Sequence, residues 1–235
     1  MNSPDPASGP DPAGSPDLAT STDSAGESAT SGGSVVGEPV VTAAAGRLAR
    51  LITEVLAPWV IVLVLPLGVA WQATRTTSGT LLWGFVVSVT SSLLPMLVIL
   101  WGARTGRWDG HHVRNREGRL VPFLALIGLS STGLGLLVLG GAPWPMTALD
   151  LSMITTLLAT WAITAKWKIS MHTAVAGGAV VMLTTTYDPR LWVLTLLVIA
   201  IGWSRVWVGD HTPAQVVGGV LVGALIGGGS YITLL

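Results

Sequence analysis

The stretch from residue 204 to residue 234 reads SRVWVGDHTPAQVVGGVLVGALIGGGSYITL. Its first part is polar, whereas the part after Pro213 is apolar and rich in glycine. Because proline suits the first turn of a helix, we expect a helix over residues 214–234, which is long enough to span a membrane. Gly219, Gly223 and Gly227 recur at every fourth position, and this spacing predicts close packing against a neighbouring helix.

The composition extends this prediction to most of the chain. Of 235 residues, 50% are hydrophobic and 10% are charged, against about a quarter charged in an ordinary soluble domain. The fold class is therefore all-α, a polytopic transmembrane bundle of about six to seven helices. The expected helical spans are residues 53–72, 80–102, 120–141, 147–165, 170–187, 190–207 and 214–234.

Residues 1–48 differ from the rest of the chain. They are rich in Pro, Ser, Gly, Ala, Thr and Asp and carry almost no large apolar side chains. Such a segment buries too little apolar area to offset its ordering entropy, so we predict a disordered tail over residues 1–48. The membrane domain is expected over residues 49–235, and nothing after Met1 has the pattern of a signal peptide.

Several functional classes are excluded by composition. The formal net charge is zero and there is no cysteine, so we expect neither a nucleic-acid binder nor a disulfide framework nor a cysteine-ligated zinc site. The ionisable residues instead gather in three loop clusters, at residues 109–122, 166–172 and 204–215. An even number of crossings separates the clusters, which puts them on one side of the membrane. Ionisable residues in such a protein usually mark a site.

The three clusters together offer guanidinium groups, ammonium groups, hydroxyls and two well-separated imidazoles. Arginine binds phosphate oxygens bidentately and stays charged. One imidazole can attack phosphorus while a second protonates the leaving oxygen. The predicted site face has no carboxylate cluster for Mg²⁺ and no zinc-ligand spacing, so we expect phosphoryl-transfer chemistry with no metal and no cofactor.

Two of the clusters resemble motifs of the type 2 phosphatidic acid phosphatase (PAP2) superfamily. The third cluster is similar to the S-R-x5-H-x3-D motif, in which Ser204, Arg205 and His211 match. The second is similar to the P-S-G-H motif, in which Ser170 and His172 match. The resemblance covers about residues 53–235 and implies a helical membrane phosphatase.

The first cluster resembles the R-x-x-R-x-x-P form of the remaining motif in divergent bacterial members. Arg116, Arg119 and Pro122 occupy its positions. The lysine of the longer K-x6-R-P form is replaced by His112.

The resemblance also implies the role of each residue. His211 is the expected nucleophile, which forms a phosphohistidine, and His172 is the expected general acid. The residues expected to bind the phosphate oxygens are Arg205, Ser170, Arg119, Arg116 and Lys168.

The chain departs from the family pattern at the last motif position, where Gln215 replaces aspartate. Glutamine occurs at this position in dolichyl-diphosphatase-like members. Gln215 lies one helical turn after His211, so we expect its oxygen to accept the Nδ1 proton of His211 and fix the tautomer without supplying negative charge. Met171 and Ile169 replace the glycine and proline of the second motif.

These features predict a metal-independent integral-membrane hydrolase of phosphoric monoesters or diphosphates. Its substrate is expected to be a lipid phosphate or diphosphate of polyprenyl or phosphatidate type, and its partners are that lipid and the bilayer, with no nucleic acid. Two alternatives stay open: an anion-binding transporter or channel, and a catalytically inactive scaffold with the same fold.

The distribution of Lys and Arg predicts the orientation. Ten of the twelve fall on the side of the site, and five remain there against two after five basic residues that could bind phosphate are set aside, namely Arg114, Arg116, Arg119, Lys168 and Arg205. The positive-inside rule then favours a multi-pass protein of the cell membrane with a cytoplasmic site. The ten are Arg47, Arg50, Arg104, Arg107, Arg114, Arg116, Arg119, Lys166, Lys168 and Arg205.

Overall fold

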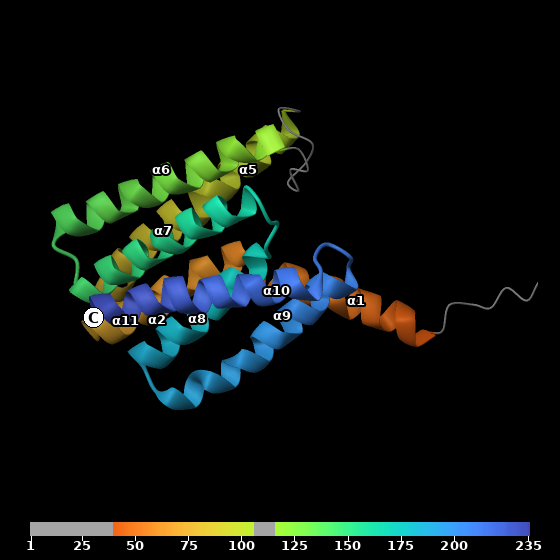
Figure 1. The fold of residues 1–235 in the computed structure, drawn as a ribbon. Coiled ribbons are helices and arrows are strands. Elements are labelled where there is room, and N and C mark those ends of the chain that lie inside the picture. Colours follow the sequence, from red (N-terminus) through yellow and green to blue (C-terminus); the bar gives the residue numbers. More distant parts are fainter. Residues whose placement is uncertain (1–39, 106–115) are drawn as a thin grey trace, which may run out of the picture. The chain divides into compact units, whose positions relative to one another are not determined.

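The computed structural model describes residues 40–105 and 116–235, and the environments of side chains from residues 43–105 and 123–235. Every regular element in this part of the chain is helical, as expected from the all-α fold class (Figure 1). Residues 1–39 of the predicted tail lie outside the described residues. The rest of the predicted tail, residues 40–48, is helical, so the helical domain begins earlier than predicted.

The helical segments follow one another along the chain with short connections. They are α1 (Val40–Val55), α2 (Pro58–Thr74), the continuous stretch α3 (Thr77–Gly79), η1 (Thr80–Gly84), α4 (Phe85–Ser88), η2 (Val89–Leu93) and α5 (Leu94–Arg104), then α6 (Arg116–Gly140), α7 (Trp144–Thr164), α8 (Met171–Thr186), η3 (Pro189–Leu194) with α9 (Thr195–Trp207), and α10 (Pro213–Leu221), η4 (Val222–Gly228) and α11 (Gly229–Leu234).

Each of the seven predicted spans corresponds to a helical segment, but not all of them have the length of a membrane span. Five described helices are long and apolar enough to cross a bilayer, and the bent pair of α1 and α2 makes a sixth. Helix α8 has only 16 residues, which is about 24 Å of helix against ~30 Å of hydrocarbon. It is therefore shorter than the other candidate spans, and most of its residues are buried.

The first predicted span, residues 53–72, was wrong at its start. The structure has two helices there, α1 and α2, which meet at a bend of 47°. Pro58 is the cause, because a proline drives the residue before it out of the helical region, and Ala57 is indeed extended (φ −63°, ψ 150°). Helix α1 packs against α9, so the bend brings a segment outside the predicted bundle to the end of α9.

The breaks expected between the spans near residues 141, 188 and 213 are present in the structure. Helix α6 ends at Gly140 and is followed by Gly141 with φ +71°. Asp188 accepts a hydrogen bond from the Arg190 N–H (2.7 Å) at the start of η3, and Pro213 is the first residue of α10. These signals are local, which is why the sequence alone was sufficient to place them.

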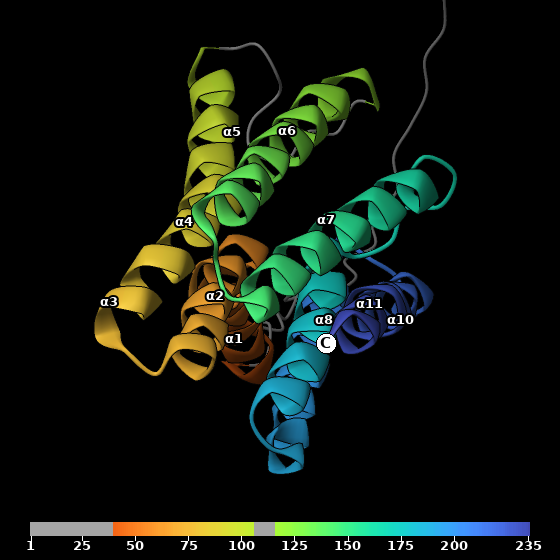
Figure 2. The same cartoon turned by 90° about the vertical axis from the view of Figure 1, so that its left-hand side faces the viewer.

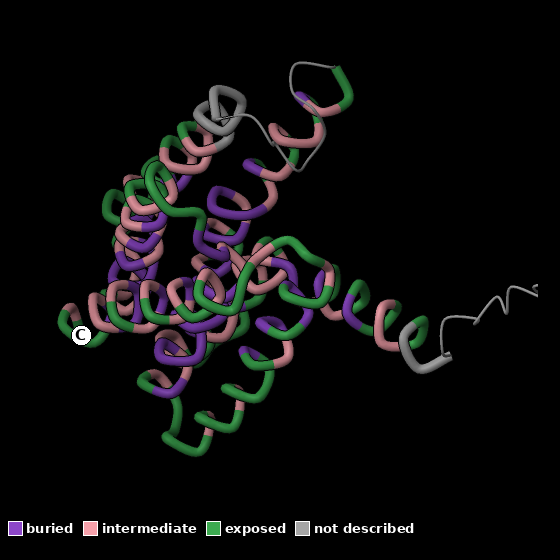
Figure 3. Tube along the Cα trace, turned by 45° about the vertical axis from the view of Figure 1, so that its right-hand side comes forward, coloured by how far each residue is buried: buried purple, intermediate pink, exposed green. Residues whose placement is uncertain are grey.

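Helix α8 lies at the centre of the fold, between α2 and the α10–α11 helix (Figure 2). Most of its residues are buried, and the buried residues concentrate in this inner part of the bundle (Figure 3). Large apolar side chains point outward on the other helices, for example Leu196, Ile199 and Leu225, which are more than half exposed. Such a surface is compatible with lipid and not with water.

At the contact between α8 and α10–η4, the backbones of the two helices touch each other directly. A methyl group at Gly223 would collide with the Ala174 carbonyl, and one at Gly219 would collide with the Ser170 carbonyl and the Thr173 hydroxyl. The Thr173 hydroxyl also donates to the Val216 carbonyl at 2.9 Å. The prediction of close helix packing at the glycine repeat is therefore confirmed, and α8 is its partner.

Candidate active site

The turn between α9 and α10 is built on Gly209, whose φ of +76° favours glycine. Its N–H donates to the Val206 carbonyl (3.0 Å), and the N–H groups of Asp210 and His211 both donate to the Arg205 carbonyl (3.2 Å each). The first two bonds form a Schellman motif, which ends the helix and reverses the chain. As a result, the backbone of Asp210 and His211 is held against Arg205.

A capping box begins α10 immediately after His211. The Thr212 hydroxyl accepts the Gln215 N–H (3.3 Å), and Gln215 Oε1 accepts the Thr212 N–H (3.1 Å). His211 Nδ1 is buried and has no hydrogen-bond partner of good geometry in the described part of the chain. Gln215 still lies near enough to favour the charged imidazole, but its oxygen is engaged by the backbone of Thr212.

The second cluster contacts the third, as expected from the count of membrane crossings. The Ser170 N–H donates to the Gln215 carbonyl at 3.1 Å, and Lys168 Nζ donates to the Asp210 carbonyl at 2.8 Å. The loop before α8 is thus bonded to both sides of the turn that carries His211.

Only part of the first cluster can be placed. Arg116 and Arg119 belong to the first turns of α6, which starts at the same end of the bundle as the other two clusters (Figure 1). Their side chains lie outside the described residues, as do residues 109–115.

In the second and third clusters, three buried polar atoms have no hydrogen-bond partner among the described residues: Ser170 Oγ, Arg205 Nε and His211 Nδ1. Ser170 is fully buried and stands at the N-cap position of α8, yet its hydroxyl does not cap the helix. A buried polar atom without a partner costs about 1–3 kcal/mol. The Ser170 hydroxyl and the Arg205 Nε–H group can donate hydrogen bonds to the oxygen atoms of an anion, and the partial positive charge at the N-terminus of α8 favours an anion near Ser170.

The electrostatic environment of His211 favours its neutral form. Burial, and then the positive charges of Lys168 and Arg205, lower the pKa of His211 to about 4. The imidazole is therefore uncharged at neutral pH and keeps a nitrogen lone pair available for attack. Arg205 is 5% exposed and forms an ion pair with Asp210, in which Nη2 and Oδ2 are 2.6 Å apart.

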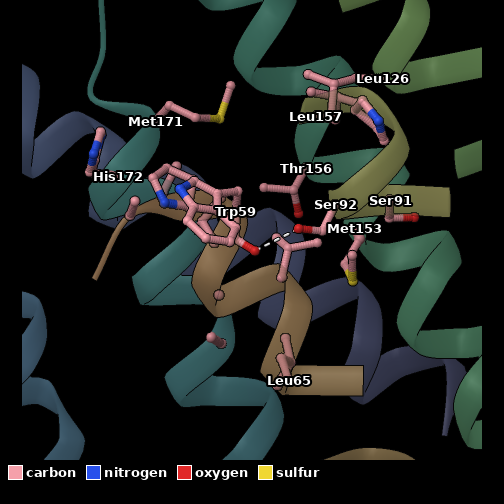
Figure 4. A pocket seen from close by; sticks show the side chains of 18 of the residues that line it. Trp59, Leu65, Ser91, Ser92, Leu126, Met153, Thr156, Leu157, Met171 and His172 are labelled. Atoms are coloured by element: carbon pink, nitrogen blue, oxygen red, sulfur yellow. Dashed lines mark hydrogen bonds between the residues drawn. The ribbon is translucent and has the colours of Figure 1, made fainter. Parts of the chain in front are cut away.

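His172 lies in the first turn of α8 and lines a cavity of about 390 Å³. The wall of this cavity is mostly apolar and comes from α1, α2, η2, α5, α6, α7 and α8. Figure 4 shows His172 and Trp59 at one side of the cavity, and Ser91 and Met153 at the other. The cavity therefore reaches the start of α8, where the buried Ser170 occupies the N-cap position.

Sequence reasoning missed the contribution of α1. The Thr53 hydroxyl donates to the Ser204 hydroxyl (3.1 Å), and Glu54 lines the cavity together with His172. The available signal was a polar Thr-Glu pair inside an apolar run, four residues before Pro58. Within the described part of the chain, no group of three or more His, Asp or Glu side chains is arranged to hold a metal ion.

Fold and site together define a polytopic helical protein with several candidate membrane spans and with buried polar side chains at one end of the bundle. A family model described as the PAP2 superfamily matches residues 9–234, nearly the whole chain. The chain belongs to the PAP2 superfamily and is a membrane phosphatase. Comparisons with curated proteins and with solved structures found no significant match.

Replacing Lys168 by glutamine is expected to raise the pKa of His211, because it removes a positive charge that disfavours the imidazolium. The pKa is measured by NMR titration of histidine-labelled protein in detergent, with the His211 signal assigned from a His211→Asn variant. Arg190→Gln, which removes a positive charge from the far end of α8, is the control and should leave this pKa unchanged. An unchanged pKa in Lys168→Gln would contradict the electrostatic account.

Proposed function

We propose that the protein hydrolyses a lipid phosphate or diphosphate through a phosphohistidine intermediate on His211. The observation that carries this proposal is that Ser170 Oγ and Arg205 Nε are buried without a hydrogen-bond partner in the described chain, in two segments whose backbones are bonded to the turn and helix start that flank His211. A phosphate group offers acceptors for the hydroxyl and the guanidinium at the same time. The match to the PAP2 superfamily supports the same chemistry.

In the first step, the phosphate oxygens accept hydrogen bonds from Ser170 Oγ and Arg205 Nε, and the N-terminus of α8 adds its positive partial charge. Nε2 of the neutral His211 attacks phosphorus while the bond from phosphorus to the lipid oxygen breaks. His172 gives its proton to the leaving oxygen. Lys168, Arg116 and Arg119 are the further positive groups proposed to stabilise the transition-state charge.

In the second step, water attacks the phosphorus of the phosphohistidine. His172, now neutral, accepts a proton from the water, and the bond from phosphorus to His211 Nε2 breaks. Inorganic phosphate leaves, and both imidazoles return to their starting states. With a diphosphate substrate, the first leaving group is the lipid monophosphate. Gln215 serves as a positioning residue, because its capping box fixes the backbone next to His211.

The apolar cavity supports a substrate with a hydrocarbon tail. It begins at His172, the proposed proton donor to the lipid oxygen, and is lined deeper in the bundle by side chains such as Leu65 and Met182. An acyl or isoprenyl chain in this cavity would gain about 0.8 kcal/mol for each CH₂ removed from water. A soluble phosphate ester would gain nothing from such a wall.

His211→Asn is expected to lower the hydrolysis of phosphatidate or of a polyprenyl diphosphate at least about 10⁴-fold, because it removes the nucleophile. Phosphate release is measured in detergent with EDTA, and the phosphoenzyme is trapped with ³²P-labelled substrate. Asp188→Asn at the opposite end of α8 is the control and should be as active as the wild type.

Three results would contradict the proposal in different ways. Wild-type hydrolysis by His211→Asn would exclude His211 as the nucleophile. Anion flux without hydrolysis would favour a transporter or channel. Failure of every lipid phosphate to release phosphate or to label the wild-type protein would favour an inactive scaffold.

We also propose that the site faces the cytoplasm of a cell membrane, because the described basic residues at the site end outnumber Arg75 and Arg190 at the other end. The chain contains no cysteine, so a single introduced cysteine reports one position. In intact cells, a membrane-impermeant maleimide should label Arg190→Cys and not Lys166→Cys, both of which are exposed positions. The reverse labelling pattern would contradict this orientation.

A further inference from the structure

Arg205 and Asp210 form an unequal ion pair. The Arg205 side chain is 5% exposed, whereas that of Asp210 is 47% exposed. A guanidinium removed from water needs a counter-charge, because an uncompensated buried charge is strongly destabilising. Asp210 supplies that counter-charge from the solvent side, with its Oδ2 atom 2.6 Å from Nη2.

The ion pair with Asp210 engages only part of the hydrogen-bonding edge of the Arg205 guanidinium. Nε and Nη2 of an arginine lie on one edge and can hold two oxygens of the same anion. Asp210 occupies Nη2, while Nε has no hydrogen-bond partner in the described residues. A phosphate bound to the whole edge must therefore take the place of the Asp210 carboxylate at Nη2.

The backbone around Asp210 allows this exchange without moving the loop. The Asp210 N–H is bonded to the Arg205 carbonyl (3.2 Å), and the Asp210 carbonyl accepts Lys168 Nζ (2.8 Å). These bonds fix the main chain on both sides of the residue. The half-exposed side chain has only to rotate into solvent to free the guanidinium edge.

We propose that the Asp210 carboxylate neutralises Arg205 before the substrate binds. It occupies the position of a substrate phosphate oxygen at Nη2, so it competes with every anion that binds to Arg205. This inference rests on the proposed function only in placing the substrate phosphate at Arg205. Asp210 carries one negative charge, whereas a phosphomonoester carries about −1.5 to −2 at pH 7. The competition therefore favours a terminal phosphate over the singly charged phosphodiesters of ordinary membrane lipids.

The test compares anion binding in the wild type and in Asp210→Asn, with the proteins in detergent and binding measured by calorimetry. Inorganic phosphate is expected to bind Asp210→Asn at least about tenfold more tightly, because its competitor has lost its charge. Phosphatidylglycerol, a phosphodiester, should change from a weak to an effective competitor of phosphate binding. Asp188→Asn is the matched control: it makes the same charge change at an exposed pair with Arg190 and should bind phosphate as the wild type does.

Weaker or unchanged phosphate binding by Asp210→Asn would overturn the inference, since it would mean that Asp210 orients Arg205 for the anion. If this variant needs phosphate to stay folded, the rise of its melting temperature with phosphate concentration replaces calorimetry, and a rise no larger than that of the wild type would overturn the inference. Asp210→Glu keeps the charge and should bind phosphate within about threefold of the wild type. Because binding is measured without turnover, loss of hydrolysis in all proteins would contradict the proposed function and not this inference.

Discussion

The site depends on one constraint, the direct backbone contact between α8 and the α10–η4 helix. Gly219 and Gly223 face the carbonyls of Ser170 and Ala174 with no room for a side chain. Because the two helices touch at their site ends, the N-terminus of α8 is bonded to the first turn of α10, from Ser170 N–H to the Gln215 carbonyl. Ser170 and His172 lie at the start of α8, and Arg205 and His211 flank the turn that precedes α10. This contact therefore sets the positions of the described functional groups of the proposed reaction.

Close packing also explains how the site tolerates unfavourable groups. Ser170 and Arg205 are buried with polar atoms that have no partner in the described chain, and His211 is held neutral by burial and by nearby positive charges. Each of these features costs free energy. The close packing holds the groups in place, and the proposed phosphate would accept hydrogen bonds from Ser170 and Arg205. Under the proposed function, the fold therefore preorganises the site before the substrate binds.

The sequence predicted the parts of the structure that depend on local signals. The breaks between the spans near residues 141, 188 and 213 were correct because glycine, aspartate and proline act on the backbone close to them. The bend before Pro58 was missed because α1 was assigned in part to the tail, although an Ala-Pro step is itself a local signal.

The glycine repeat predicted a close contact, but its partner, α8, is set by long-range packing. Gln215 was expected to accept the Nδ1 proton of His211, whereas its T-x-x-Q pattern with Thr212 also describes a capping box. The pairing of Asp210 with Arg205 depends on the turn at Gly209 and could not be read from spacing.

The most direct measurement of the central claim is the affinity for inorganic phosphate, together with thermal stability, in Gly223→Ala and in Gly229→Ala. A methyl group at Gly223 collides with the Ala174 carbonyl, whereas Gly229 has no atom within 4 Å of the added carbon. Gly223→Ala should lose roughly 2–10 °C in melting temperature and at least about tenfold in phosphate affinity, because α8 and α10 must separate. Gly229→Ala should retain both properties. Wild-type phosphate affinity in Gly223→Ala would contradict the claim that this helix contact builds the site.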